Sequence, residues 1–214
     1  MNNFYRTLRF LLSGVIKLFM NLRVVNKHNQ PKKNDGPFII CANHISALDP
    51  IAIAVTLKHI QPHYLGKQQL FKNKFLAWFF GKLGMIPVNR SGNDVGALKT
   101  TINLLKEGKS IGIFPQGTRH PGEDPRDTKV RHGIGMIQSY ANASVLPIYI
   151  KTKDNKAKLF RKTVIILGDV ITAEEIGKVG KGSAEYERIS NMVFDRICTL
   201  GEEYEKIAGK KNEF

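Results

Sequence analysis

The sequence predicts an α/β protein whose central sheet is mixed but largely parallel and is flanked by helices. Short apolar runs rich in Ile, Val and Phe recur between residues 37 and 167, and segments with apolar residues at helical spacing separate them. Strands that alternate with helices in this way pair into parallel or mixed sheets that are covered on both faces. The 214 residues, 42% of them hydrophobic, are enough for one domain with a full core.

Each element is predicted from its own pattern of apolar and turn residues. The apolar runs place strands at residues 37–42, 63–66, 85–88, 110–114, 145–150 and 163–167. Helical spacing places helices at residues 48–58, 74–83, 95–106, 133–141 and 183–207. The last helix is the most clearly marked, because its apolar residues are predicted to form one face: Ile189, Val193, Ile197, Leu200, Tyr204 and Ile207.

The first 34 residues differ from the rest of the chain because they contain many basic residues and no acidic one. On a helix, one side collects Phe4, Leu8, Leu11, Leu12, Val15, Ile16 and Phe19, and the other collects Arg6, Arg9, Ser13 and Lys17. This pattern is typical of an amphipathic helix in an anionic membrane interface, and a helix packed on the protein body or a secretory signal are the alternatives. We therefore predict a membrane-associating segment with a linker at residues 1–34 and a globular domain at residues 35–214. No window reaches the roughly 18 uninterrupted apolar residues of a membrane-spanning helix.

The charge of the chain favours anionic partners. Lys and Arg number 33 against 18 Asp and Glu, which gives a formal net charge of +15. Nucleic acid, anionic lipid headgroups and phosphorylated substrates all suit such a surface. A nucleic-acid-binding protein remains an alternative, although the basic residues are not interleaved with aromatic ones as single-strand binding would require. Cys41 and Cys198 are the only cysteines, stand in no metal-ligand spacing and suit a reduced cytosolic setting.

A histidine and an aspartate follow the first buried strand. His44 and Asp49 stand where the apolar run 38–42 ends, and strand ends of this kind bind ligands in open α/β sheets. With a turn between them, the carboxylate can hold one imidazole nitrogen and leave the other free to take a proton from an alcohol. No nucleophile-elbow pattern accompanies the pair, so a bound hydroxyl would attack directly. The alternative is a structural histidine and a helix-capping aspartate.

Basic residues follow three further predicted strands. Lys67 and Arg90 each end one, and a third runs into Gln116-Gly117-Thr118-Arg119. The glycine permits close approach of a ligand to the backbone, while the hydroxyl and the guanidinium are donors that suit a phosphate. Each basic residue taken alone can equally be a solvated surface residue. Their repeated position at strand ends favours an anion site.

Four segments, taken in order, resemble the conserved blocks of the glycerolipid acyltransferases. They are Asn43-His44 with Asp49, the segment that ends at Arg90, Phe114-Pro115-Gln116-Gly117-Thr118-Arg119, and Val145-Leu146-Pro147-Ile148. The resemblance covers roughly residues 37–167 and is strongest to the bacterial 1-acyl-sn-glycerol-3-phosphate acyltransferases.

The resemblance implies a reaction and a role for each matching residue. The sn-2 hydroxyl of a lysophosphatidic acid would attack the thioester of acyl-ACP or acyl-CoA and yield phosphatidic acid. His44 would be the base and Asp49 its orienting partner, Lys67, Arg90 and Arg119 would hold the acceptor phosphate, and Gln116, Gly117 and Thr118 would complete the substrate site. The resemblance implies no metal and no cofactor beyond the thioester co-substrate. It also implies a peripheral or monotopic protein at the cytoplasmic face of the cell membrane.

The chain departs from the family pattern at Gln116, where the family usually carries Glu, and at Gln69, where an acidic residue is common. An amide keeps the size of the side chain and an acceptor but loses the charge. A different lysolipid acceptor and a catalytically weak, lipid-binding paralogue are therefore alternatives. The apolar run Phe75-Leu76-Ala77-Trp78-Phe79-Phe80 could line an acyl-chain tunnel, dip into lipid or form ordinary core, and Arg131 is a further candidate for phosphate binding.

Overall fold

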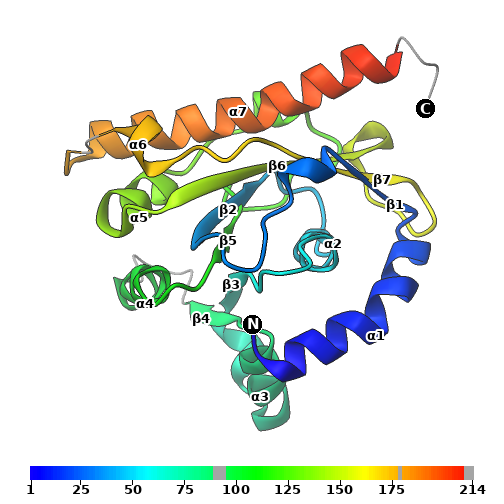
Figure 1. Cartoon of the computed structure of the whole chain (residues 1–214), viewed down its shortest axis with the longest axis horizontal. Helices are drawn as coiled ribbons and strands as arrows, with labels where there is room; N and C mark the ends of the chain where they lie inside the picture. Colours follow the sequence, from blue (N-terminus) through cyan, green and yellow to red (C-terminus); the bar gives the residue numbers. More distant parts are fainter. Residues whose placement is uncertain (89–94, 178–179, 210–214) are drawn as a thin grey trace.

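The protein is described by a computed structural model that places residues 1–88, 95–177 and 180–209. Across these residues one sheet carries seven strands in the order β1-β7-β6-β2-β5-β3-β4, with helices on both of its faces (Figure 1). The strands are β1 Leu22–Val25, β2 Phe38–Ala42, β3 His63–Lys67, β4 Ile86–Val88, β5 Ile111–Ile113, β6 Ser144–Thr152 and β7 Thr163–Leu167. The helices are α1 Asn3–Phe19, α2 Asp49–Thr56, α3 Lys74–Lys82, α4 Val95–Lys106, α5 Gly133–Ala141, α6 Ala173–Ile176 and α7 Ser183–Gly209, with short 3-10 turns at Lys27–Asn29, Gln68–Phe71, Pro125–Asp127 and Lys153–Asn155.

Strand direction confirms the predicted mixed, largely parallel sheet. The strands β6, β2, β5, β3 and β4 are parallel neighbours, whereas β7 is antiparallel to β6 and parallel to β1. The carboxyl ends of β2, β5 and β3 therefore meet at one edge of the sheet. This is the edge at which the sequence predicts the functional residues.

The apolar core forms two layers, one on each face of the sheet. Alternate residues of β2 point to opposite layers: Ile39 and Cys41 pack with residues of α5 and α7, whereas Phe38, Ile40 and Ala42 pack with residues of α2. Every residue of β2 is buried, as is usual for a central parallel strand covered on both sides. The strand that leads into His44 is thus rigidly held.

The predicted elements are confirmed with small shifts at their ends, but two elements were missed. Leu22–Val25 forms β1, which pairs in parallel with β7 at the edge of the sheet. Ala173–Ile176 forms α6, which opens with a capping box between Thr172 and Glu175. Since β1 contributes to the sheet, the segment predicted as an anchor and linker also adds a strand to the domain. The division between residues 1–34 and 35–214 stays a prediction.

Helix α1 begins where the side chain of Asn2 accepts a hydrogen bond from the backbone N–H of Tyr5. Its apolar residues are divided between the protein and the exterior. Tyr5 is buried and Ile16 packs on the core layer of α2, whereas Leu11 and Leu18 are 64% and 71% exposed. The helix therefore offers apolar side chains both to the protein and to the outside. Among the described helices, none is both long and apolar enough to cross a bilayer.

Candidate active site

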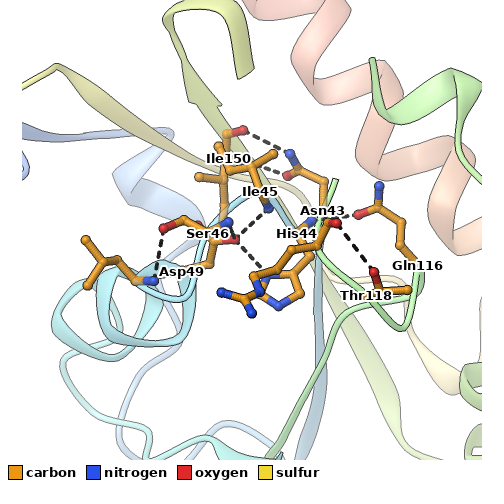
Figure 2. Close-up of polar contacts among 10 residues, drawn as sticks. Asn43, His44, Ile45, Ser46, Asp49, Gln116, Thr118 and Ile150 are labelled. Atoms are coloured by element: carbon orange, nitrogen blue, oxygen red, sulfur yellow. Dashed lines mark hydrogen bonds and ion pairs between the residues drawn. The ribbon is translucent and has the colours of Figure 1, made fainter. Parts of the chain in front are cut away.

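The site begins at Asn43, the residue after β2. Its buried side chain donates to the carbonyl oxygen of Ile150 at 3.0 Å and accepts from the backbone N–H of Ile150 at 2.7 Å (Figure 2). These two bonds satisfy a backbone donor and acceptor of the neighbouring strand β6, as the backbone of a longer β2 would do. The amide thus fixes the end of β2, and with it the start of the turn that carries His44.

His44 and Asp49 are brought together by the turn that leads into α2. The imidazole Nδ1 lies 2.8 Å from the carboxylate Oδ2 of Asp49. The same oxygen accepts the backbone N–H groups of Ile45 at 2.7 Å and of Ser46 at 2.8 Å (Figure 2). Asp49 is 1% exposed and stands in the first turn of α2, where the positive end of the helix dipole also stabilises its charge.

This arrangement selects one tautomer of the neutral imidazole. Because the ionised carboxylate is only an acceptor, the Nδ1 atom of His44 carries the proton and Nε2 keeps its lone pair. The His44 side chain remains 16% exposed, so a substrate can reach the ring. The pair has the arrangement needed by a general base.

Aromatic rings support the imidazole from the β5 side. The ring of Phe114, the residue after β5, stacks on His44 with a centroid distance of 3.9 Å and an interplanar angle of 14°. Tyr64 of β3 stacks on the other side of Phe114 at 5.9 Å. A Cβ atom on Gly112 would lie 2.0 Å from the Tyr64 ring, so glycine is needed there for the ring to pack. The three stacked rings stand on or next to three neighbouring strands, β2, β5 and β3, and together they fix the orientation of the His44 ring.

Gln116 holds the backbone of His44. Its Oε1 accepts the N–H of His44 at 2.6 Å, and its Nε2 donates to the hydroxyl oxygen of Thr128 at 2.8 Å. That hydroxyl donates in turn to the carbonyl oxygen of Pro125 at 2.7 Å. Gln116 is 3% exposed, so its position is structural rather than that of a residue open to solvent. The contact with the histidine uses an oxygen, which both an amide and a carboxylate possess.

Gly117 makes the turn that leads to the predicted phosphate-binding residues. Its φ is +72°, a left-handed value that favours glycine, and its N–H donates to the carbonyl of Phe114 at 3.0 Å. A Cβ atom at this position would lie 3.1 Å from Cγ of Arg131. Thr118 and Arg119 follow on the exposed surface, and the N–H of His120 donates to the carbonyl of His44 at 2.8 Å. Thr118 and Arg119 thus lie in a segment that is bonded to the histidine backbone.

Among the other predicted site residues, Lys67 ends β3 and is exposed at the same edge of the sheet. Two strand spacings separate β3 from β2, which corresponds to about 10 Å between the two strands. Arg90 lies outside the described residues. Gln69 is exposed in the 3-10 turn after β3, and Pro147 is buried in β6 opposite Cys41.

The run Phe75–Phe80 forms most of α3 and has no buried residue, so it is not ordinary core. Among the described residues, no group of three or more His, Cys, Asp or Glu side chains gathers as metal ligands do.

Several residues that build the site were not singled out from the sequence. Thr128 and Ile150 contact site residues from 12 and 107 positions away, and no local pattern marks either of them. Phe114 was noted only as part of its block, and the only available signal was its place next to a strand end.

Comparisons with known proteins show the family to which the chain is similar. The acyltransferase family model matches residues 21–151, which include His44, Asp49 and the Gln116–Arg119 turn. A 1-acyl-sn-glycerol-3-phosphate acyltransferase of Bacillus subtilis is 33% identical over 151 residues, 71% of this chain and 73% of the relative. Another of that name, from Streptococcus pneumoniae, is 28% identical over 205 residues, 94% of this chain and 74% of the relative.

The fold also has a solved counterpart. The crystal structure of the 1-acyl-sn-glycerophosphate (LPA) acyltransferase PlsC from Thermotoga maritima matches with a TM-score of 0.62 and 24% identity, over 92% of this chain and 82% of that one. At this identity the likeness shows a shared fold. The family model matches more than half of the chain, and the chain therefore belongs to the acyltransferase family.

Proposed function

We propose that the protein moves a fatty acyl group from an acyl thioester to the sn-2 hydroxyl of 1-acyl-sn-glycerol-3-phosphate, which forms phosphatidic acid for phospholipid biosynthesis. The observation that carries this proposal is the 2.8 Å contact of His44 with Asp49 at the strand edge, in a chain whose curated relatives are named for this activity. The pair supplies a base whose ring is firmly held and remains partly exposed.

In the proposed reaction, Nε2 of His44 takes the proton of the acceptor hydroxyl while its oxygen attacks the thioester carbonyl. The tetrahedral intermediate collapses, the carbon–sulfur bond breaks, and the proton on Nε2 passes to the departing thiolate. Asp49 stays ionised and stabilises the imidazolium that forms. Cys41 is an unsuitable nucleophile, because burial raises the pKa of its thiol well above the ordinary range. Direct attack therefore suits this site better than a covalent enzyme intermediate.

Basic residues at the same edge suit the phosphate of the acceptor. Arg119 follows the Gly117 turn, Lys67 ends β3, and the side chain of Arg131 lies against Gly117. A guanidinium can donate two parallel hydrogen bonds to phosphate oxygens, and an ammonium adds a mobile positive charge. We assign Arg119 and Lys67 to the acceptor phosphate. Arg90 keeps this role on its position in the sequence alone.

Lipid substrates require the enzyme to work at a membrane. We place α1 at an anionic bilayer surface, because its outward side carries exposed apolar residues such as Leu11 and Leu18, and Arg6 and Lys17 of the same helix are also exposed. This gives a peripheral or monotopic protein, and a cytosolic thioester donor places it at the cytoplasmic face.

One experiment tests the proposed function directly. The purified protein is incubated with lysophosphatidic acid and a panel of other lysolipids, each with acyl-ACP or acyl-CoA, and the products are identified by mass. We expect phosphatidic acid from lysophosphatidic acid. Product from a different lysolipid alone would favour the altered acceptor that Gln116 raised as an alternative, and no product with any pair would favour the catalytically weak paralogue.

A further inference from the structure

The loop between β6 and β7, residues 153–162, carries two neighbouring apolar side chains that are open to solvent. Leu159 and Phe160 are each 64% exposed. Large apolar side chains that are exposed next to each other in a loop indicate a surface that contacts a partner or a membrane. We refer to residues 153–162 as the β6–β7 loop.

Phe160 has a backbone conformation that is uncommon for a bulky residue. Its φ is +59°, a left-handed value at which glycine or asparagine is usual and a bulky side chain is uncommon. The N–H of Phe160 donates to the carbonyl of Phe19, and the two rings lie 5.1 Å apart. The loop therefore presents an aromatic ring in a position where the turn geometry favours a smaller residue, and it does so beside the end of α1 (Figure 1).

The charge of the β6–β7 loop indicates the kind of surface that covers it. Five basic residues flank Leu159 and Phe160 in the sequence of the loop: Lys153, Lys156, Lys158, Arg161 and Lys162. Asp154 is the only acidic residue of the loop and forms an ion pair with Arg161 at 3.8 Å. Apolar and aromatic side chains flanked by basic residues are the composition of a segment that enters the interface of an anionic bilayer. Continuity with the exposed apolar side of α1, through Phe19, extends the same character over a larger surface.

The β6–β7 loop leaves the sheet at the edge that carries the active site. Since β6 and β2 are parallel, the end of β6 and the turn with His44 lie at the same edge. Asn155 accepts the N–H of Gly122 at its carbonyl oxygen and donates from its side chain to the carbonyl of Glu123, each at 2.9 Å. The segment that these bonds reach is joined to His44 through the N–H of His120. The base of the loop and the site are thus connected by hydrogen bonds.

We propose that the β6–β7 loop is a second lipid-contacting element, which inserts Leu159 and Phe160 into an anionic bilayer beside α1. Insertion of the loop would turn the sheet edge that carries His44 towards the bilayer, where a lipid acceptor is found. This benefit for catalysis rests on the proposed function. The contact itself does not depend on catalysis.

A fluorescence experiment tests the contact in the full chain. A Leu159→Cys variant is labelled with an environment-sensitive fluorophore, since Cys41 and Cys198 are buried, and is mixed with vesicles of phosphatidylcholine and phosphatidylglycerol. The control is Asn191→Cys on the exposed side of α7, which covers the opposite face of the sheet from α1. We expect a blue shift and quenching by brominated acyl chains at position 159 and neither at position 191. An unchanged emission at position 159 would overturn the proposal.

A second pair of variants separates lipid contact from folding. Phe160→Gly relieves the left-handed strain, so we expect an unchanged or higher Tm together with vesicle partitioning that is weaker by about tenfold or more. Leu159→Ser should weaken partitioning likewise, whereas Ile207→Ser, an equally exposed apolar position on α7, should not. If Phe160→Gly, Leu159→Ser and Ile207→Ser all partition equally onto vesicles, the proposal is contradicted.

Acyl transfer measured in detergent micelles separates this proposal from the proposed function. If the loop does not contact vesicles but turnover is present in micelles, the loop proposal fails and the function stands. Bilayer contact without turnover on any lysolipid would leave the loop proposal supported and remove the function.

Discussion

His44 is held by four contacts, two to its imidazole ring and two to its backbone. Asp49 binds Nδ1, Phe114 stacks on the ring, Gln116 binds the backbone N–H, and His120 binds the backbone carbonyl. The partners lie on α2, after β5 and in the loop beyond it, so no single segment determines the position of the ring. A base held in this way needs little reorganisation when the acceptor hydroxyl arrives.

Gln116→Glu tests whether the amide is adapted to its surroundings. The Thr128 hydroxyl donates its hydrogen to Pro125, so the atom of residue 116 that faces it must be a donor. A carboxylate would either face an oxygen lone pair or draw the hydroxyl away from Pro125. We expect unfolding in denaturant to show a loss of about 1–3 kcal/mol, the usual cost of an unsatisfied buried polar group, and no rise in turnover. Higher turnover at unchanged stability would indicate instead that Gln116 weakens the enzyme.

At the scale of the element, the turn at Gly117 lies against the Arg131 side chain and leads into Arg119. Gly117→Ala adds a Cβ atom at a left-handed position and 3.1 Å from the Arg131 side chain. We expect a loss of about 1–2 kcal/mol in stability and a higher KM for the lysolipid acceptor, because the basic residues shift. Gly133→Ala at the start of α5 is the matched control, since a Cβ atom there meets nothing within 4 Å. If Gly117→Ala behaves like this control in both measurements, the turn does not set the phosphate site.

Helix α1 is tested best by substitutions on its outward side rather than by deletion, because Tyr5 and Met20 belong to the buried interior. Leu11→Ser with Leu18→Ser removes two exposed apolar side chains from the proposed membrane surface. We expect less protein to sediment with anionic liposomes, while the Tm stays within about 2 °C of the parent because few packing contacts are lost. Val95→Ser, at a position 70% exposed on α4, controls for lost surface hydrophobicity in general. Equal sedimentation of both variants would exclude α1 as an anchor.

The sequence predicted elements best where their own residues carry the pattern. The strand β2 is buried throughout and the helix α7 buries one apolar face, and both could be predicted from the run or the spacing of their apolar residues. The strand β1 was missed because it has only four residues, one of them Arg23, and comes directly after the amphipathic pattern of α1. Its pairing depends on β7, about 140 positions later. The apolar stripe of α1 was predicted, but its division between protein and exterior depends on α2, which the sequence of α1 does not contain.

At the scale of the whole molecule, the net charge of +15 makes attraction to anionic surfaces dependent on salt. Raising the ionic strength from 0.1 to 1 M shortens the Debye length from about 10 Å to about 3 Å. We expect liposome association to fall strongly over this range with anionic vesicles and to be weak throughout with neutral ones. The same titration with DNA tests the nucleic-acid alternative: retardation of DNA at salt concentrations where liposomes are released would favour it.

The arrangement of the site could be predicted only in part. The resemblance named His44, Asp49 and the Gln116–Arg119 turn, and the alternation of strands and helices placed them at strand ends. It could not supply the strand order, which sets β5 between β2 and β3 and so stacks Phe114 between His44 and Tyr64. Nor could it supply the bonds of Asn43 to Ile150, which depend on the register of β2 against β6. These features arise from long-range pairing, which leaves no periodic trace in the sequence.

The account rests on the imidazole of residue 44 as the base that takes the proton of the acceptor hydroxyl. The most direct measurement is the turnover of His44→Ala on lysophosphatidic acid with its preferred thioester, beside the parent protein and with the fold checked by circular dichroism. We expect turnover to fall by about 10²–10⁴-fold, the usual contribution of a positioned general base, while the spectrum and liposome binding are kept. Turnover within a few fold of the parent, in a variant that is folded, would contradict the account.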